Sequence, residues 1–282
     1  MRKMVEIFYT ERNFSVPMLK RRVAAVLAIL ISTTQSNGLA AKSLPEISVE
    51  ATTAVVYISF KYTDQTTAVK EGFASGVLVS GDGDVLTTYE SIRRWNEQSD
   101  SNKAAAPLFG QIGSSESPIK MHLHVIAFEP STDIALLKLS DTSSLRAPAP
   151  VCYAKPPIGA LIHALGFSGG PNFKPISGNF AGESSTSSAW TGVFVFEAGM
   201  SGAPIYNEAG KVVGLVQRGD AVAPTTTDIV PIQRAKSMLA NNTSVLENCA
   251  SSQTQNGACR EVPFTDNSKF PPITTTFLDC SN

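Results

Sequence analysis

Short segments rich in β-branched and aromatic residues recur along the middle of this chain, and turn-forming residues separate them. Ser75–Ser80 and Asp84–Thr87 flank Gly81-Asp82-Gly83, which is a strong hairpin signal. We expect further strands at Thr52–Phe60, Lys120–Phe128, Ile134–Leu139, Leu161–Leu165, Gly192–Phe196, Pro204–Tyr206 and Val212–Gln217. Short strands at such spacing predict an all-β sandwich or barrel. Only two segments have a helical pattern, Glu90–Gln98 and Pro231–Ala240.

The N-terminus carries the pattern of a secretory signal peptide. Lys20-Arg21-Arg22 precede the apolar run Val23–Ile31, and small residues follow at Gly38 and Ala40. A basic region, a short apolar run and a small-residue cleavage site are typical of export. We therefore expect residues 1–40 to be a signal peptide with an N-terminal extension, and the mature chain to be periplasmic or secreted. A buried core helix is the alternative interpretation.

The charge of the mature chain excludes one class of partner. Six of the 23 basic and two of the 24 acidic side chains lie in residues 1–40, so 17 and 22 remain, a net charge of −5. A mildly acidic chain without basic clusters is a poor nucleic-acid binder. Because no run of eighteen apolar residues is present, we expect no membrane span in the mature chain. The oligomeric state is left open.

All four cysteines lie in the part expected to be exported: Cys152, Cys249, Cys259 and Cys280. An even number in an exported chain predicts two disulfides. Three pairings exist; Cys249–Cys259 closes the shortest loop and leaves Cys152 to pair with Cys280. That second bridge would tie an irregular tail, residues 241–282, to the body of the protein. Zinc is the alternative, but no Cys-x-x-Cys pair occurs, so we expect no metal and no cofactor.

The segment Gly199-Met200-Ser201-Gly202-Ala203-Pro204 has the composition of a nucleophile turn. Nucleophilic serine catalysis needs an activated hydroxyl and N–H donors for the developing oxyanion. Gly199 permits a backbone in which its own N–H and that of Ser201 point into one space, forming an oxyanion hole. The alternative interpretation is an ordinary glycine-rich turn before a strand.

Four segments carry a family resemblance, and they occur in the order Ala74–Thr87, Ser131–Leu139, Ala160–Phe167 and Gly199–Leu215. Together they resemble the bacterial type of the trypsin-like (chymotrypsin-fold) serine peptidases, over roughly residues 50–240. The resemblance implies two six-stranded antiparallel Greek-key barrels, over residues 45–150 and 151–240, with a short C-terminal helix and the Cys-containing tail. It also implies a peptide or protein as substrate or ligand.

The resemblance assigns the catalytic positions one by one. Ser201 falls on the nucleophile, and Asp133 falls on the aspartate that orients the base. The base should follow a Leu-Thr-x-x segment; here Leu86–Tyr89 is followed by Glu90, so a glutamate occupies the histidine position. Met200 and Ala203 also depart from the family, which usually has Asp or Asn and a second Gly there.

The substrate cleft implied by the resemblance is apolar. Its residues would be Val195 and the segment Val213, Gly214, Leu215 and Val216. Apolar walls favour apolar P1 side chains rather than Lys or Arg.

The three histidines are poor substitutes for the missing base. If Phe128 paired with Asp133, His124 would lie opposite Leu137, about 13 Å from Asp133 along the strand, with His122 farther away. His163 belongs, by the resemblance, to the first strand of the second barrel. A structural role is the simpler interpretation for all three.

The chemistry of the Glu90 position decides the predicted activity. A carboxylate with a reference pKa of about 4.3 is a weak base toward a serine hydroxyl. Loss of the histidine alone lowers kcat by about 10⁶ in subtilisin. The sequence therefore predicts an exported homologue with impaired or no proteolytic activity. Two alternatives stay open: an active endopeptidase with an unconventional base, and a disulfide-stabilised extracytoplasmic peptide- or protein-binding module.

Overall fold

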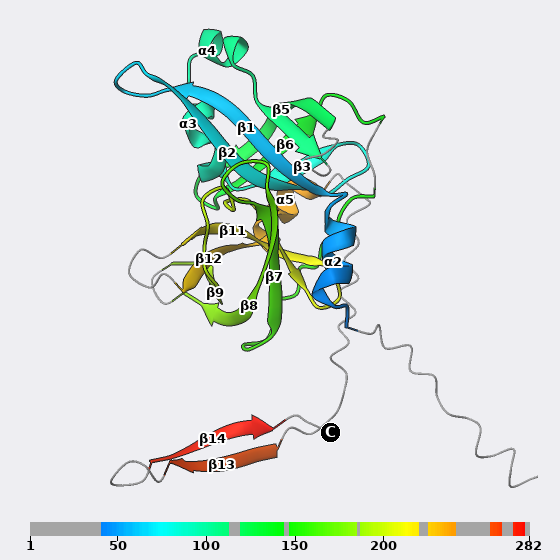
Figure 1. Ribbon diagram of the computed structural model, residues 1–282, viewed down its shortest axis with the longest axis vertical. Helices are drawn as coiled ribbons and strands as arrows, with labels where there is room; N and C mark the ends of the chain where they lie inside the picture. The colour runs from blue at the N-terminus through cyan, green and yellow to red at the C-terminus, as the bar shows by residue number, and fades with distance from the viewer. Residues whose placement is uncertain are drawn as a thin grey trace, which may run out of the picture. The chain divides into compact units, whose positions relative to one another are not determined.

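The structure, a computed structural model of the 282-residue chain, describes residues 41–112, 119–143, 147–184, 187–219, 225–240, 260–266 and 273–279. Twelve of the described strands form two closed antiparallel barrels (Figure 1), which confirms the predicted fold class. No helix in these ranges is long and apolar enough to cross a membrane. The expected signal peptide lies outside the described residues, so export stays a prediction.

The first barrel consists of six strands whose alternating side chains build its core. They are β1 (Val55–Thr63), β2 (Val69–Leu78), β3 (Asp84–Thr87), β4 (Phe109–Ile112), β5 (Ile119–Glu129) and β6 (Ile134–Leu139). The order around the barrel is β1-β2-β3-β6-β5-β4. The predicted hairpin at Gly81–Gly83 is present: Val77 pairs with Leu86 across it, and both side chains are fully buried.

The second barrel repeats this topology. Its strands are β7 (Leu161–Phe167), β8 (Phe173–Glu183), β9 (Trp190–Val193), β10 (Pro204–Asn207), β11 (Val212–Gly219) and β12 (Thr226–Pro231). The order around this barrel is β7-β8-β9-β12-β11-β10. Adding six to each strand number of the first barrel gives the same order. The two barrels are thus structural repeats, although no internal repeat is evident in the sequence.

Three strands that close the barrels were missed in the sequence, namely β4, β8 and β12. β8 shows why: most of its side chains are exposed or half-buried, and it contains two glycines and a proline. A strand with such a composition lacks the β-branched and aromatic residues that mark a strand.

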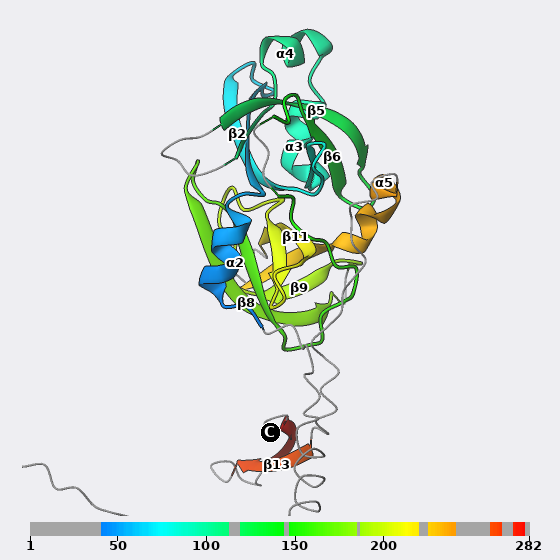
Figure 2. The same cartoon turned by 90° about the vertical axis from the view of Figure 1, so that its right-hand side faces the viewer.

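Four helical regions accompany the barrels. α3 (Tyr89–Asn96) and the pair η1 (Ile232–Ala235) and α5 (Lys236–Leu239) correspond to the two predicted helices. α2 (Leu44–Ala51) and α4 (Asp100–Ala105) were not predicted. α2 begins at a capping box between Ser43 and Glu46, and it lies against β7 and β8 of the second barrel (Figure 2).

The two barrels meet in a continuous apolar interface, because the core of the first barrel extends to Phe167 and Leu215 of the second. One buried hydroxyl links three segments at this interface. The Ser75 Oγ–H on β2 donates to the carbonyl of Gly199 at 2.9 Å, and Ser75 Oγ accepts the N–H of Phe167 on β7 at 2.9 Å. Ser75 therefore fixes the Gly199 turn against both barrels.

The pairing of β5 with β6 differs from the expected register. Phe128 lies opposite Ala135, and His124 lies opposite Lys138 rather than Leu137. The expectation was wrong for two physical reasons. The connecting turn lies one residue further along the chain than assumed, because pairing starts at Glu129 with Ile134 rather than at Phe128 with Asp133, and a β-bulge at Ile126 shifts the ladder by one residue.

The tail is more regular than expected where it is described. β13 (Arg260–Asp266) and β14 (Ile273–Asp279) form an antiparallel pair. Of the four cysteines only Cys152 falls within the described residues; it is buried and is not a free thiol. Cys249, Cys259 and Cys280 lie outside the described residues, so their pairing stays a prediction.

Candidate functional site

Ser201 lies in a tight turn between β9 and β10, at the junction of the two barrels. The turn needs glycine at two positions, since the φ angles of Gly199 and Gly202 are +98° and +80°. A Cβ on Gly202 would lie 2.1 Å from Thr87 Oγ1 and 2.2 Å from the carbonyl oxygen of Ser75. The turn is therefore pressed against β2 and β3 of the first barrel.

The two predicted oxyanion-hole donors are available. The carbonyl of Ala198 accepts the N–H of Gly169, and the carbonyl of Met200 accepts that of Ala203. In a trans peptide the N–H points opposite to the C=O, so the N–H groups of Gly199 and Ser201 point away from those partners. Neither N–H has an acceptor among the residues that the structure describes.

Met200 and Ala203, the two departures from the family pattern in this turn, do not occupy those donors. Both side chains are buried in the core of the second barrel, where they pack beside Gly166. The departures therefore affect the packing below the turn and do not place a hydrogen-bond acceptor on either N–H.

Asp133 lies at the end of the turn between β5 and β6, in the left-handed region with φ +55°. Asp is one of the few non-glycine residues that adopt this conformation readily. Its Oδ1 accepts the N–H of Glu90 at 2.8 Å, and its Oδ2 accepts Nε2–H of Gln217 at 2.8 Å. Burial raises the pKa of Asp133, an effect opposed by these two hydrogen bonds and by the charge of Arg234, while the charge of Glu90 adds to it.

Replacing this carboxyl, Asp133→Asn, is expected to remove the loss of stability that the wild type undergoes as pH rises through the folded pKa of Asp133, although the amide nitrogen of Asn does not accept the Gln217 Nε2–H. Because the pKa of Asp133 is higher in the folded than in the unfolded protein, protonation of Asp133 stabilises the fold. That stabilisation is complete below the unfolded pKa and is lost as pH rises through the folded pKa. Asn stays neutral, tolerates the positive φ and still accepts the Glu90 N–H.

The measurement is urea unfolding of the wild type and of Asp133→Asn between about pH 3 and pH 8. We expect the advantage of the variant to grow with pH. An advantage that stays constant over this range would contradict the raised pKa of Asp133.

Glu90, in the first turn of α3, is hydrogen-bonded to Asp133 through its backbone N–H and not through its side chain. Its carboxylate accepts Arg93 Nε–H at 2.7 Å and Arg93 Nη2–H at 2.9 Å, and its side chain is 60% exposed. The structure therefore brings the backbone of position 90 to Asp133, while the carboxylate faces the outer surface.

The Ser201 hydroxyl donates to the backbone carbonyl of Gln217 at 3.1 Å. Among the described residues, no carboxylate or imidazole is hydrogen-bonded to it. Gln217 was missed in the sequence, where the expected cleft ended at Val216. The available signal was its position as the first polar residue after the apolar run of β11.

The histidines lie away from this chemistry. His163 is buried, its Nδ1 is 2.8 Å from Ser177 Oγ, and burial lowers its pKa. The ring of His122 packs on Phe109, with 4.6 Å between ring centroids, and His124 is exposed. None of the three is hydrogen-bonded to Ser201 or Asp133.

The residues expected to form the substrate cleft divide into two groups. Val195 is 54% exposed, whereas Val213, Leu215 and Val216 are buried in the barrel cores. Gly214 lies within the β11–β12 pairing, where a Cβ would be 2.6 Å from Ile229 Cγ2. Of the expected cleft side chains, Val195 is therefore the one that a ligand can contact.

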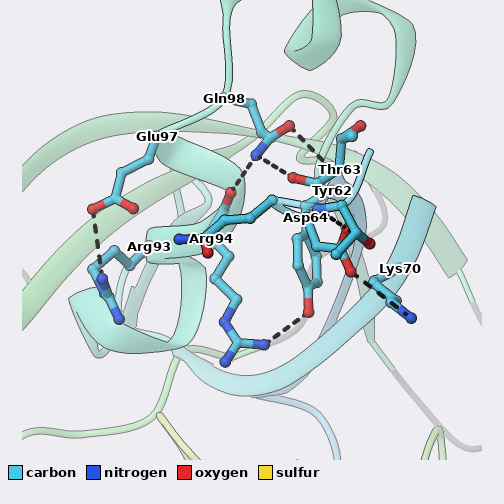
Figure 3. Close-up of a pocket in the computed structure, with 10 residues that line it drawn as sticks. Tyr62, Thr63, Asp64, Lys70, Arg93, Arg94, Glu97 and Gln98 are labelled. Carbon is cyan, nitrogen blue, oxygen red and sulfur yellow. Dashed lines mark hydrogen bonds and ion pairs between the residues drawn. The ribbon is translucent and has the colours of Figure 1, made fainter. Parts of the chain in front are cut away.

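A polar cavity of about 730 Å³ lies beside α3 and the β1–β2 turn (Figure 3). Arg93 in its wall pairs with Glu97, and Arg94 donates to the hydroxyl of Tyr62 at 2.7 Å. Arg93 also holds the carboxylate of Glu90. The ion pair that keeps Glu90 at the surface is therefore part of this polar cluster.

Comparisons with known proteins agree with the geometry. A family model described as a trypsin-like peptidase domain matches residues 74–215, a region that includes Glu90, Asp133 and Ser201. The chain is similar to the crystal structure of the Rv3671c protease from M. tuberculosis in its active form. The TM-score is 0.54 at 22% identity, over 69% of this chain and 82% of that one, so the likeness concerns the fold. No curated protein matches the chain.

Proposed function

The chain belongs to the trypsin-like peptidase domain family, and we propose that it is an exported member that binds a peptide or protein segment and hydrolyses it slowly or not at all. The observation that carries this proposal is the hydrogen bond from Ser201 Oγ–H to the carbonyl of Gln217. A backbone carbonyl accepts a hydrogen bond but does not remove the proton, so the hydroxyl is not activated as a nucleophile.

The position of Glu90 argues against an active enzyme with a carboxylate base. Its two oxygens are both engaged with the guanidinium of Arg93 on the protein surface. A carboxylate held in this way points away from the Ser201 hydroxyl and is not positioned to take its proton. Turning toward Ser201 would also break this ion pair and place a second carboxylate beside Asp133.

The backbone groups that could bind a ligand carbonyl are present, whereas a base that would activate Ser201 is not hydrogen-bonded to it among the described residues. The N–H groups of Gly199 and Ser201 are available, and such a pair stabilises a carbonyl or oxyanion. One exposed apolar side chain lies beside the turn: Phe73 is 38% exposed, and its ring lies 2.9 Å from where a Cβ of Gly199 would be. These features support binding of a peptide, with little chemistry to follow.

A serine-directed phosphonate probe tests the proposal. We expect the purified wild-type protein to remain unlabelled under conditions in which trypsin is labelled completely, because no carboxylate or imidazole of the described residues is hydrogen-bonded to Ser201. Ser201→Ala is the matched control for reaction elsewhere on the protein. Rapid stoichiometric labelling of the wild type that disappears in Ser201→Ala would contradict the proposal and support the active-peptidase alternative.

A further inference from the structure

Gln217 contacts both catalytic positions that the chain retains. Its backbone carbonyl accepts the hydroxyl of Ser201, and its side-chain Nε2–H donates to Oδ2 of Asp133, 2.8 Å away. With the Glu90 N–H on Oδ1, a continuous set of hydrogen bonds joins positions 201, 217, 133 and 90. No other described residue touches both Ser201 and Asp133 by hydrogen bonds.

A β-bulge gives Gln217 this double role. The register between β11 and β12 shifts between Val216, which pairs with Ile229, and Arg218, which pairs with Asp228. Gln217 is the extra residue, so its backbone is released from the strand ladder. The released carbonyl is the one that accepts the Ser201 hydroxyl.

The amide makes the contact to Asp133 that an imidazole base normally makes. In a complete triad the buried aspartate accepts the ring N–H of the histidine, which holds the base in place. An ionised carboxylate only accepts hydrogen bonds, so the nitrogen of the Gln217 amide is the end that suits it. Asp133 is 7% exposed and therefore needs such a partner when it is charged.

We propose that Gln217 is the positioning residue of this site: in place of an imidazole, its amide fixes the charged carboxylate of Asp133, while its carbonyl holds the hydroxyl of Ser201. This inference rests on the proposed function, in which no base competes for these contacts. Two charged groups also act on Asp133. The charge of Glu90 on α3 raises the pKa of Asp133, and the charge of Arg234 on η1 lowers it.

The test is the titration of Asp133 in the full-length protein, followed by NMR of Asp side chains labelled with carbon-13 at Cγ and assigned with Asp133→Asn. We expect Gln217→Ala to move the titration midpoint up by about one pH unit, because a hydrogen bond to the charged form is lost. Gln217→Glu should move it further, since two carboxylates then share the site. An unchanged midpoint in Gln217→Ala would overturn the proposal.

Gln98→Ala is the matched control. The amide of Gln98 also joins two segments, because it bonds to Thr63 and to the carbonyl of Arg94, but it contacts no carboxylate. We expect this variant to leave the Asp133 midpoint in place; an equal shift would reveal a general loosening and overturn the proposal. Gln217→Asn, whose amide is one methylene too short, replaces Gln217→Ala if that variant does not fold. Labelling of the wild type by phosphonate would contradict the proposed function without deciding this titration.

Discussion

The double variant Glu90→His with Gln217→Ala is expected to react with a serine-directed phosphonate at least about 100-fold faster than the wild type, the lower range for a general base. The Glu90 N–H already bonds to Asp133, so a histidine at this position begins from a backbone held beside the orienting aspartate. The N–H groups of Gly199 and Ser201 have no acceptor among the described residues, so they can donate to the negative charge that develops on the phosphonate oxygen.

The second substitution matters because Gln217 occupies Oδ2 of Asp133. An imidazole at position 90 has to donate its ring N–H to the same carboxylate to be held as a base. We therefore expect Glu90→His alone to react at least about tenfold more slowly than the double variant, a difference of about 1.4 kcal/mol in the barrier. Losing the exposed pair of Glu90 with Arg93 should lower stability by less than about 1 kcal/mol.

Two controls accompany this experiment. Adding Ser201→Ala to the double variant has to abolish labelling, which shows that the reaction occurs at Ser201. Glu90→Gln with Gln217→Ala removes the carboxylate without supplying a base and should stay unreactive. If that control reacts as fast as the histidine variant, the gain does not come from general-base catalysis.

Gly202→Ala is expected to produce the largest loss of stability, about 3–5 kcal/mol, from backbone strain at φ +80° together with overpacking. The added methyl would meet a hydroxyl and a backbone carbonyl of the first barrel at 2.1 and 2.2 Å. Backbone does not yield as the end of a flexible side chain does. Thermal unfolding followed by circular dichroism should show a Tm lower by about 10 °C.

Gly81→Ala is the matched control, since a Cβ there meets nothing within 4 Å and the residue has no positive φ. Its free energy of unfolding should change by less than about 1 kcal/mol. A Gly202→Ala variant as stable as Gly81→Ala would show that the turn is not packed against the first barrel as described.

The sequence was most informative where local chemistry decides the structure. The Gly81–Gly83 hairpin follows from turn residues between β-branched runs, and both barrels follow from the repetition of such runs together with the family resemblance. The spacing after Leu86 placed Glu90 in the base position, and the structure brings its backbone N–H to Asp133. β8 escaped prediction because it closes a barrel with an exposed, glycine-containing strand.

The contacts of the site were beyond sequence reasoning for a different reason. Gln217, which donates to Asp133, is the extra residue of a bulge in β11, and a bulge depends on how two strands pair. The direction of the Glu90 carboxylate depends likewise on Arg93, one turn further along α3. Val213 and Leu215 belong to the matched family segment, yet burial in the cores withdraws them from any ligand.

The packing of Gly202 against Ser75 and Thr87 has an evolutionary consequence. A lineage that no longer cleaves peptides would still lose stability by changing this glycine, so purifying selection on stability alone preserves much of the Gly-x-Ser-Gly signature. The Gly-x-Ser-Gly motif is then conserved because it packs the turn of the second barrel against the first barrel, even where peptide cleavage is no longer under selection. Among such descendants, the identity of the residue at position 90 is a better marker of activity than the serine turn itself.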